Sequence, residues 1–567
     1  MMTMKPTVTL MRSVVRRLAR SALPLAVAVA ALVSTVTRDA IADTADLVFE
    51  NGTIFTVDAQ DSVAQALAIK NGKIVYVGNN SGAASWKDGT TRTVDLKGKM
   101  VLPGFVDSHS HVYLRTEAMF WVNLNGARSL QQYKERTQDF LRQHPGAKQV
   151  RGVGFDLGLV LKTVADSGVP ASRLLDEIVG QDIPAVFLTN GHHQIWVNSR
   201  AMKNAAITED TRDPEGASID RDANGKPIGI FREFAAQNLI IQKLPFSDFT
   251  IDEFTQAVLS FQTEVAAPRG ITSVRVPVHY PTEAYLRALK QLDAEKKLTL
   301  RQDLVLWADE TRGVSQVPEL VDRHNKYFGT YFKIAGVKFF GTGVGQKSNL
   351  VWKQDVLNRT IAAVDKEGLQ IFIHVVGPTS DYAAMLDALE YAIKQNGKRD
   401  SRHAITHTHT PATPLVARFA ALGVWADGHP PPKAFFDAGI KVTSSSDYPA
   451  FEHTPSPALA ARIGFSLAAR PLAQIETGVQ RGVPIAQMIR SHTLTGAELI
   501  FSEKETGSLE VGKTADIVVL ERDITKVPVE DIHTTKILTT LFAGKMVYRD
   551  AGFEEAAQIP LERPRAD

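Results

Sequence analysis

Apolar runs that alternate with helical segments dominate the middle of the chain. Eight runs rich in β-branched and aromatic residues read as strands, and most of them are followed by a helical pattern such as Tyr382–Lys394 or Leu415–Ala421. The eight runs are Met100–Val106, Ile271–Val278, Leu298–Trp307, Ile334–Phe340, Leu369–Val376, His403–His407, Leu422–Ala426 and Ile440–Ser445. Strands that alternate with helices predict an α/β fold built on a (β/α)8 TIM barrel, in which reactive groups lie where the strands end.

Both ends of the chain show a different pattern, in which short strands alternate apolar and polar residues. These strands lie in Asp46–Val77, Ala515–Leu520 and Ile537–Tyr548. We predict that residues 43–99 and 505–567 form one small β-sandwich domain from both chain ends. Residues 100–504 would then form the barrel.

The interval between the first and second apolar runs is too long for a single helix. Residues 113–269 are therefore predicted to be an inserted subdomain after barrel strand 1. This segment contains a strand pattern of its own at Ala185–Thr189 and a turn-rich stretch at Asp213–Gly229. An insertion beside the carboxyl end of the first strand is expected to cover the site.

The N-terminus has the pattern of a secretory signal peptide. Four arginines precede the apolar run Ala22–Val36, and small residues follow at Ala40–Ala42. We predict that residues 1–42 are removed, which indicates a periplasmic or secreted protein with no membrane association after cleavage. A retained anchor is the alternative, but the run is short for a bilayer span of about 20 residues. The choice between the general and the twin-arginine export routes stays open.

Composition narrows the chemistry that the chain can perform. The 567 residues include no cysteine, which excludes disulfides, thiolate metal sites and a cysteine nucleophile. Any metal must be held by histidine, carboxylate or a modified residue. The formal net charge of +2 does not indicate a nucleic-acid partner.

Polar side chains recur at the predicted strand ends. In an extended segment His109 and His111 point the same way, so one divalent metal ion can bind both imidazoles. Four later strands carry the other candidates, which are Lys338, His374, His407 and Asp447. Each has a plain alternative: surface histidines, a lysine that reaches solvent, a hydrogen-bonded core histidine, or an aspartate that begins a turn. Their common position at one rim of the barrel favours an active site.

Longer motifs carry a resemblance to a known family. They are PGFVDSHSH (103–111), HHQIWVNSRAM (192–202), DPEGASIDRDANGKPIGIFRE (213–233), VKFF (337–340), IHVVG (373–377), RHAITH (402–407), SSSDYP (444–449) and GSLEVGKTADIVVL (507–520). Through these motifs the chain resembles the amidohydrolase superfamily of metal-dependent hydrolases. It is most similar to the branch that includes N-substituted formamide deformylases (amidohydrolase family 3).

The resemblance implies a two-metal site, with two zinc ions per chain as the expected cofactor. It implies that His109 and His111 bind one metal, that His374 and His407 bind the second, and that a carbamylated Lys338 bridges them. A carbamate offers anionic oxygens, whereas an ammonium group cannot be a ligand. Asp447 would bind the first metal and act as the catalytic residue on a metal-activated hydroxide.

The chain departs from the branch at several positions near these ligands. Thr406 stands where an acidic residue commonly precedes the strand-six histidine. Gly377-Pro378 replaces Gly-Asp, and Thr342-Gly343 follows Gly341 where Asp-Gly is common. These departures concern the surroundings of the ligands rather than the ligands.

Three residues of the insertion are predicted to contact substrate by the same resemblance. The substrate-contacting histidine aligns with His193, with His192 as the alternative, and Asp156 matches a segment that approaches the site. His409 follows His407 in phase and is a further candidate that the sequence leaves open.

The predicted function is hydrolysis of a C–N bond in an amide, N-acyl or N-formyl amine, or carbamate. Aromatic residues such as Trp196 and Trp425 are expected to border the cavity and would favour a small, apolar organic substrate. The alternatives are an ester, lactone or phosphotriester hydrolase, or an exported binding protein without catalysis. A homodimer is an open option for the oligomeric state.

Overall fold

The computed structural model describes residues 44–244, 248–278, 283–343, 350–408, 413–429, 431–450, 470–562 and 564. The predicted signal peptide and His409 lie outside these residues, so export and the role of His409 stay predictions. Within the described ranges, no helix combines the length and the apolar character needed to cross a membrane.

An eight-stranded parallel sheet forms the centre of the fold and confirms the predicted barrel. Its strands, in order around the sheet, are β8 (Phe105–Asp107), β15 (Ile271–Val278), β16 (Arg301–Trp307), β17 (Phe332–Phe340), β18 (Gln370–His374), β19 (Ala404–Thr406), β20 (Trp425–Gly428) and β21 (Val442–Ser444). All neighbouring pairs are parallel. Beyond the last and first strands, the Asp447 amide donates to His109 O at 2.8 Å and the His111 amide donates to Tyr448 O at 2.8 Å. These bonds bring the two edge strands together in a nearly closed ring.

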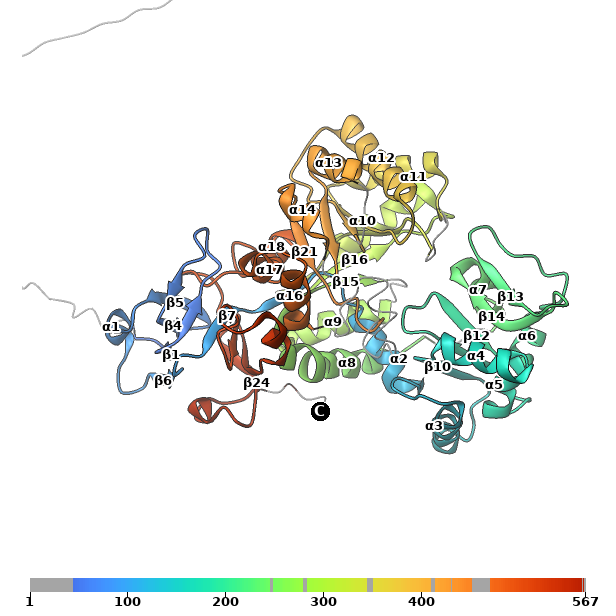
Figure 1. Cartoon of the computed structure of the whole chain (residues 1–567), viewed down its shortest axis with the longest axis horizontal. Helices are drawn as coiled ribbons and strands as arrows, with labels where there is room; N and C mark the ends of the chain where they lie inside the picture. The colour runs from blue at the N-terminus through green and yellow to red at the C-terminus, as the bar shows by residue number, and fades with distance from the viewer. Residues whose placement is uncertain are drawn as a thin grey trace, which may run out of the picture. The chain divides into compact units, whose positions relative to one another are not determined.

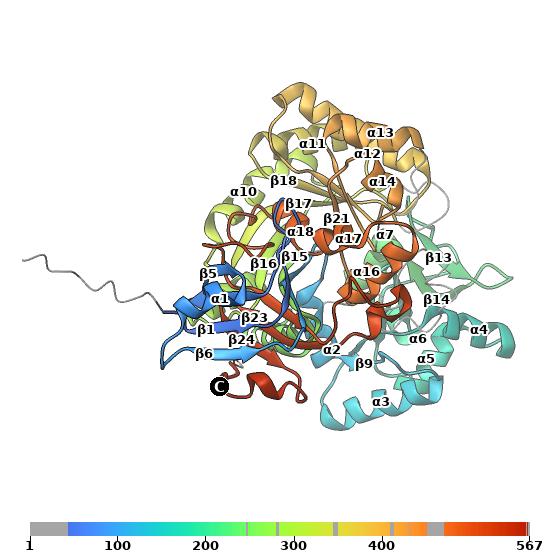
Figure 2. The same ribbon diagram turned by 60° about the vertical axis from the view of Figure 1, so that its left-hand side comes forward.

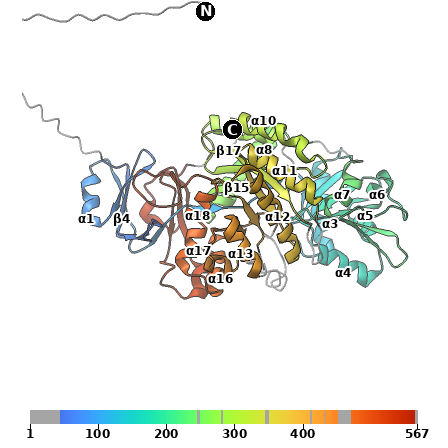
Figure 3. The same cartoon turned by 90° about the horizontal axis from the view of Figure 1, so that it is seen from above.

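Helices follow most of the barrel strands and cover the outside of the ring (Figures 1 and 2). They are α9 (Glu283–Ala294), α10 (Val317–Lys326), α11 (Gln354–Lys366), α12 (Thr379–Asn396), α13 (Thr413–Leu422), α14 (Lys433–Asp437), α16 (Pro471–Gln480), α17 (Ile485–Ser491) and α18 (Leu494–Leu499). The predicted helix Tyr382–Lys394 lies inside α12, and Leu415–Ala421 lies inside α13. Figure 3 shows α16, α17 and α18 beside one another, and successive members of this trio are in contact.

The first predicted strand, Met100–Val106, proves to be two strands that belong to different sheets. Gly104 separates β7 (Met100–Pro103), in the sheet made by the chain ends, from β8, in the barrel. A Cβ at Gly104 would lie 2.3 Å from Thr272 Oγ1, so only glycine allows the chain to pass this close to β15. An apolar run does not reveal such a division, because both strands are buried.

Strands from the two chain ends combine in one sheet, as predicted. The six-stranded sheet has the order β24 (Lys545–Arg549), β23 (Ile537–Phe542), β22 (Ile517–Leu520), β7, β2 (Thr53–Phe55) and β3 (Val63–Ala64). A four-stranded sheet of β5 (Lys73–Gly78), β4 (Ala66–Lys70), β1 (Leu47–Glu50) and β6 (Arg92–Asp95) accompanies it. Phe49 and Ile69 of the smaller sheet share one core with Ile517 and Leu541 of the larger one. In Figure 1 these strands carry the blue and red colours of opposite chain ends.

The segment between β8 and β15 forms a further mixed sheet of its own. Its strands are β13 (Ser218–Arg221), β14 (Pro227–Arg232), β12 (Gln194–Val197), β11 (Ala185–Leu188), β10 (Val150–Val153) and β9 (Val122–Asn123). The helices of this segment are α2 (Arg115–Phe120), α3 (Leu130–Gln143), α4 (Leu157–Ser167), α5 (Ala171–Val179), α6 (Ser199–Asn204), α7 (Glu233–Ile241) and α8 (Ile251–Ser260). Trp196 is fully buried in a separate apolar core beneath this sheet.

A buried histidine beneath β8 provides a test of the pH dependence of stability. His492 packs edge-on against Phe105 with ring centroids 6.2 Å apart, and its carbonyl accepts from the Val106 amide at 2.7 Å. Burial lowers the pKa of His492 from 6.5 to about 3. The unfolded chain therefore binds this proton below about pH 6.5 while the folded protein does not. Proton binding by the unfolded chain therefore lowers the free energy of unfolding as the pH falls from about 6.5 toward 3, and it has no such effect above pH 6.5.

We expect His492→Gln to lose less stability on acidification than the unchanged protein. Between pH 7 and pH 5 the difference should be about 2 kcal/mol, because each unit of pKa shift corresponds to about 1.4 kcal/mol. Urea unfolding at the two pH values measures it. Equal pH dependence in both proteins would show that His492 is not buried in its neutral form.

Candidate metal centre

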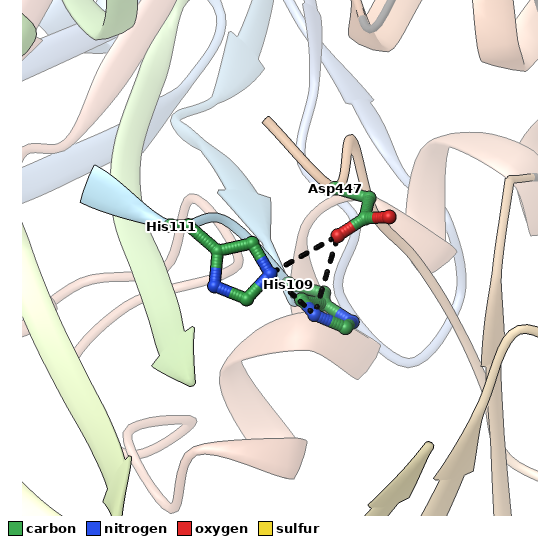
Figure 4. Close-up of side chains that lie close together, drawn as sticks. All are labelled: His109, His111 and Asp447. Carbon is green, nitrogen blue, oxygen red and sulfur yellow. Dashed lines mark hydrogen bonds and ion pairs between the residues drawn. The ribbon is translucent and has the colours of Figure 1, made fainter. Parts of the chain in front are cut away.

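Two histidines and one aspartate converge at the carboxyl ends of the first and last barrel strands. His109 and His111 follow β8, and Asp447 follows β21. The two Nε2 atoms lie 3.2 Å apart, and Asp447 Oδ1 lies 3.4 Å from His109 Nε2 and 3.2 Å from His111 Nε2 (Figure 4). All three residues are buried, so three donor atoms meet within the barrel mouth rather than on an open surface.

Hydrogen bonds on the far side of each ring determine which nitrogen can bind a metal. His111 Nδ1 lies 2.9 Å from Pro277 O, which only accepts, so Nδ1 carries the proton. His109 Nδ1 lies 2.9 Å from Thr406 Oγ1, and the single proton of this hydroxyl is donated to the carboxylate of Asp427. The hydroxyl must therefore accept from His109 Nδ1. Both Nε2 atoms consequently direct lone pairs toward each other and toward Asp447.

A divalent cation fits this donor set. Three acceptor atoms within 3.4 Å of one another, with no proton between them, repel unless a cation lies among them. In a tetrahedral zinc site with ligand distances of about 2.0–2.2 Å, the ligand atoms are about 3.3–3.6 Å apart. Burial and the nearby charge of Lys338 hold the pKa of His109 well below its ordinary value, so the ring is in its neutral, ligating form. The site is therefore suited to a divalent metal.

A second donor group shares Asp447 and includes a histidine that the sequence analysis did not select. His407, His429 and Asp447 offer ligand atoms that all lie within 4.8 Å of one another. His407 Nδ1 lies 3.0 Å from His429 Nε2, and His429 Nδ1 lies 2.6 Å from Ser445 O. His429 follows β20, so it stands at the end of the seventh strand as the other ligands stand at the ends of theirs. The same comparison of strand ends, carried one residue past Asp427-Gly428, would have identified it.

Lys338 and His374 lie beside these groups, although His374 is not a member of either. The Lys338 ammonium lies 4.8 Å from the ring centre of Phe372 and 5.3 Å from that of Phe340. Among the described residues it has no hydrogen-bond partner, and burial lowers its pKa to about 7. The His374 ring centre lies 4.5 Å from that of His407. Both side chains thus point into the region predicted for them, while their role as ligands stays a prediction.

Buried hydrogen bonds hold the loop that carries Asp447. Asp107, at the end of β8, accepts from the Ser446 amide at 2.9 Å and from the Ser446 hydroxyl at 2.5 Å. Burial raises the pKa of Asp107 to about 7. Asp447 has φ of 51° and His407 has φ of 63°, a left-handed conformation that non-glycine residues seldom adopt. The surrounding bonds compensate for this strain and keep both side chains in position.

The insertion supplies two histidine–carboxylate pairs. His193 Nδ1 lies 2.9 Å from Glu233 Oε2, and His192 Nε2 lies 2.9 Å from Glu117 Oε2. The His193 ring centre is 5.6 Å from that of His374, which places His193 at the predicted site. His192 is buried and bonded to α2 instead. Contact with substrate stays a prediction for His193, with His192 as the alternative.

Asp156 and the two tryptophans that were predicted to border the cavity have structural roles in the fold. Asp156 caps α4, because its side chain accepts from the Gly158 amide at 2.8 Å and from the Leu159 amide at 3.3 Å. Its contact with substrate stays a prediction. Trp196 and Trp425 are buried in apolar cores, so packing explains both side chains, and the apolar character of the substrate stays a prediction.

Comparisons with known proteins identify the family of the chain and relatives that cover most of its length. A model of the amidohydrolase family matches residues 92–548. An N-substituted formamide deformylase from Arthrobacter pascens is 23% identical over 551 residues, which cover 89% of this chain and 99% of that protein. Protein LONG AFTER FAR-RED 3 from Arabidopsis thaliana is 26% identical over 558 residues, which cover 89% and 92%. The solved structure of an uncharacterized metal-dependent hydrolase from Pyrococcus horikoshii OT3 matches with a TM-score of 0.62 and 21% identity, over 86% of this chain and 99% of that one, and shows the same fold.

Proposed function

The chain belongs to the amidohydrolase family and is a metal-dependent hydrolase with a His-His-Asp metal site, and we propose that it cleaves a C–N bond in a small organic substrate. The observation that carries this proposal is the convergence of His109, His111 and Asp447 at the barrel mouth. The relative from Arthrobacter pascens is an N-substituted formamide deformylase, and this similarity supports a C–N bond over an ester bond. Amides, N-acyl or N-formyl amines and carbamates are the substrate class.

We propose zinc as the metal, with two ions per chain. Histidine and carboxylate ligands suit zinc, and hydrolysis needs no change of redox state. When bound, the metal supplies a Lewis acid that polarises a carbonyl and lowers the pKa of a water molecule. His109 and His111 would hold the first ion, and His407 would hold the second with His374 or His429.

Asp447 would act first as the general base and then as the general acid of the reaction. Its carboxylate borders both donor groups, so it can accept a proton from the attacking water. The same proton can then pass to the nitrogen that leaves. A C–N bond needs this second step, because an amine is a poor leaving group until it is protonated.

We further propose that Lys338 is carbamylated and bridges the two ions. The lowered pKa of about 7 leaves a substantial fraction of the buried amine neutral, and a neutral amine is nucleophilic. Its nitrogen would form a bond to the carbon of carbon dioxide and release one proton, which gives a carbamate whose single negative charge is shared by two oxygens. Among the described residues, Lys338 Nζ has no hydrogen-bond partner that would hold it in place. A carbamate would be held by its bonds to the metal ions, and this supports the proposal.

Metal analysis combined with a substrate panel tests the proposed function. The full-length protein, purified with zinc present, should contain about two divalent ions per chain and should hydrolyse members of an amide, formamide and carbamate series. A matched ester and lactone series with the same acyl groups is the comparison. Turnover of esters or lactones alone would overturn the C–N assignment, and bound metal without turnover on any series would indicate a binding protein.

A further inference from the structure

A buried carboxylate lies behind His109, on the side away from the donor atoms. Asp427, in β20, is fully buried. Four hydroxyl groups from three other strands or their ends surround it. Oδ1 lies 2.5 Å from Ser108 Oγ and 2.9 Å from Thr443 Oγ1, and Oδ2 lies 2.6 Å from Thr406 Oγ1 and 2.9 Å from Ser445 Oγ.

The environment of Asp427 is unusual for a buried charge. Among the described residues, the only basic side chain with a nitrogen within 4.0 Å of its oxygens is His109, whose Nδ1 lies 4.0 Å from Oδ2 and whose ring is neutral. An ionised carboxylate can only accept hydrogen bonds, so the hydroxyls that face it are oriented as donors. Burying a charge is costly unless such hydrogen bonds compensate for it. Packing alone therefore does not explain a carboxylate at this position.

The connection to the metal donors runs through Thr406. This hydroxyl has one proton, which it donates to Asp427, so toward His109 it can only accept. The proton of the His109 ring is thereby held on Nδ1, and the lone pair is held on Nε2, which faces His111 and Asp447. Without the carboxylate, Thr406 could rotate and donate to Nδ1, and the proton would then occupy Nε2.

We propose that Asp427, acting through Thr406, is a positioning residue that sets the tautomer and the orientation of His109 for metal binding. The proposal rests on the metal site described above and not on a particular substrate. Metal-binding histidines commonly donate their other ring nitrogen to a carboxylate, and loss of such a partner lowers metal affinity about 10–100-fold. Here a threonine hydroxyl stands between the two groups.

The other hydroxyls extend this role from one ring to the loops around it. Ser108 directly precedes His109, and its hydroxyl lies 2.5 Å from Asp427 Oδ1 and 2.8 Å from Ser444 O, so its one proton is shared between two acceptors. Ser445 lies in the same loop as Asp447 and provides the carbonyl that His429 Nδ1 approaches. Asp427 therefore joins the first, sixth, seventh and eighth barrel strands at the level where the metal donors emerge.

Substitution of Thr406 provides the sharpest test because valine and serine separate shape from hydrogen bonding. Thr406→Val keeps the shape and removes the hydroxyl, whereas Thr406→Ser keeps the hydroxyl and is the matched control. Zinc affinity of the metal-depleted proteins is measured by competition with a chelator of known affinity. We expect binding about 10–100-fold weaker in T406V and close to the unchanged protein in T406S.

Spectroscopy gives a readout that a merely structural role would not change. With 15N-labelled histidine, NMR of the metal-depleted protein should show His109 protonated on Nδ1 in the unchanged protein and in T406S, with the resonance assigned by its loss in His109→Gln. In T406V this preference should disappear. An unchanged tautomer and unchanged zinc affinity in T406V, or equal losses in T406V and T406S, would overturn the proposal.

Asp427→Leu tests the carboxylate itself, because leucine has a similar size and no oxygen that can accept the Thr406 proton. It should lower zinc affinity and disturb the His109 tautomer as T406V does. Since it replaces a buried charge, its circular dichroism is compared with that of the unchanged protein, and T406V decides the matter if the fold is lost. Neither zinc affinity nor the tautomer depends on turnover. A failure to hydrolyse any C–N bond would therefore contradict the proposed function but not the proposed role of Asp427 and Thr406.

Discussion

Replacing Asp447 with asparagine is expected to lower kcat for C–N hydrolysis by about 10²–10⁴-fold. The asparagine amide has nearly the same shape but cannot take a proton from water or deliver one to the departing nitrogen. His109 and His111 remain in place, so at least one divalent ion should stay bound. Steady-state kinetics together with metal analysis of the purified variant measure both effects.

A matched control separates this effect from the general consequences of changing an aspartate. Asp437→Asn alters an exposed side chain whose partner is Lys433, and it should leave both kcat and metal content unchanged. Full activity in D447N would exclude Asp447 from proton transfer. Complete loss of metal in D447N would instead show that its main task is to bind the ion.

The largest expected effect on stability concerns an ion pair inside the barrel. Arg275 of β15 and Asp303 of β16 are both buried, with Nε and Nη2 of the arginine 2.9 and 2.6 Å from Asp303 Oδ2. Arg275→Met should lower the free energy of unfolding by about 3–5 kcal/mol, because buried Asp303 loses its hydrogen-bonded charge partner and keeps only Lys333, whose Nζ lies 3.8 Å from Asp303 Oδ1. Urea unfolding followed by circular dichroism measures the change.

The double variant Arg275→Met with Asp303→Leu distinguishes loss of charge pairing from loss of packing. Removal of both charges should restore most of the stability, since apolar replacement of a buried pair is often neutral. Arg359→Met is the surface control: its partner Asp355 is exposed, and the expected change is below about 1 kcal/mol. A double variant as unstable as R275M would show that the shape of Arg275, including its contact with the Phe372 ring, matters more than its charge.

Much of the barrel could be predicted because buried parallel strands leave a continuous apolar signal. Ile271–Val278 was predicted with the bounds that β15 has, and every residue of that strand is buried. The division of Met100–Val106 at Gly104 could not be predicted from hydrophobicity. It depends on the contact with Thr272, which lies far along the chain.

The sequence by itself determined the barrel, the union of the two chain ends in one sheet, and the candidate donors at the strand ends. These follow from local periodicity and from residue type, which any segment carries with it. Only the tertiary structure decided which donors meet. His429 joins His407 and Asp447, Asp427 reaches His109 through Thr406, and Asp156 serves as a helix cap. The physical reason is that these contacts link strands separated by many residues, and a hydrogen-bond network of that kind is set by the closure of the ring rather than by any one stretch of the chain.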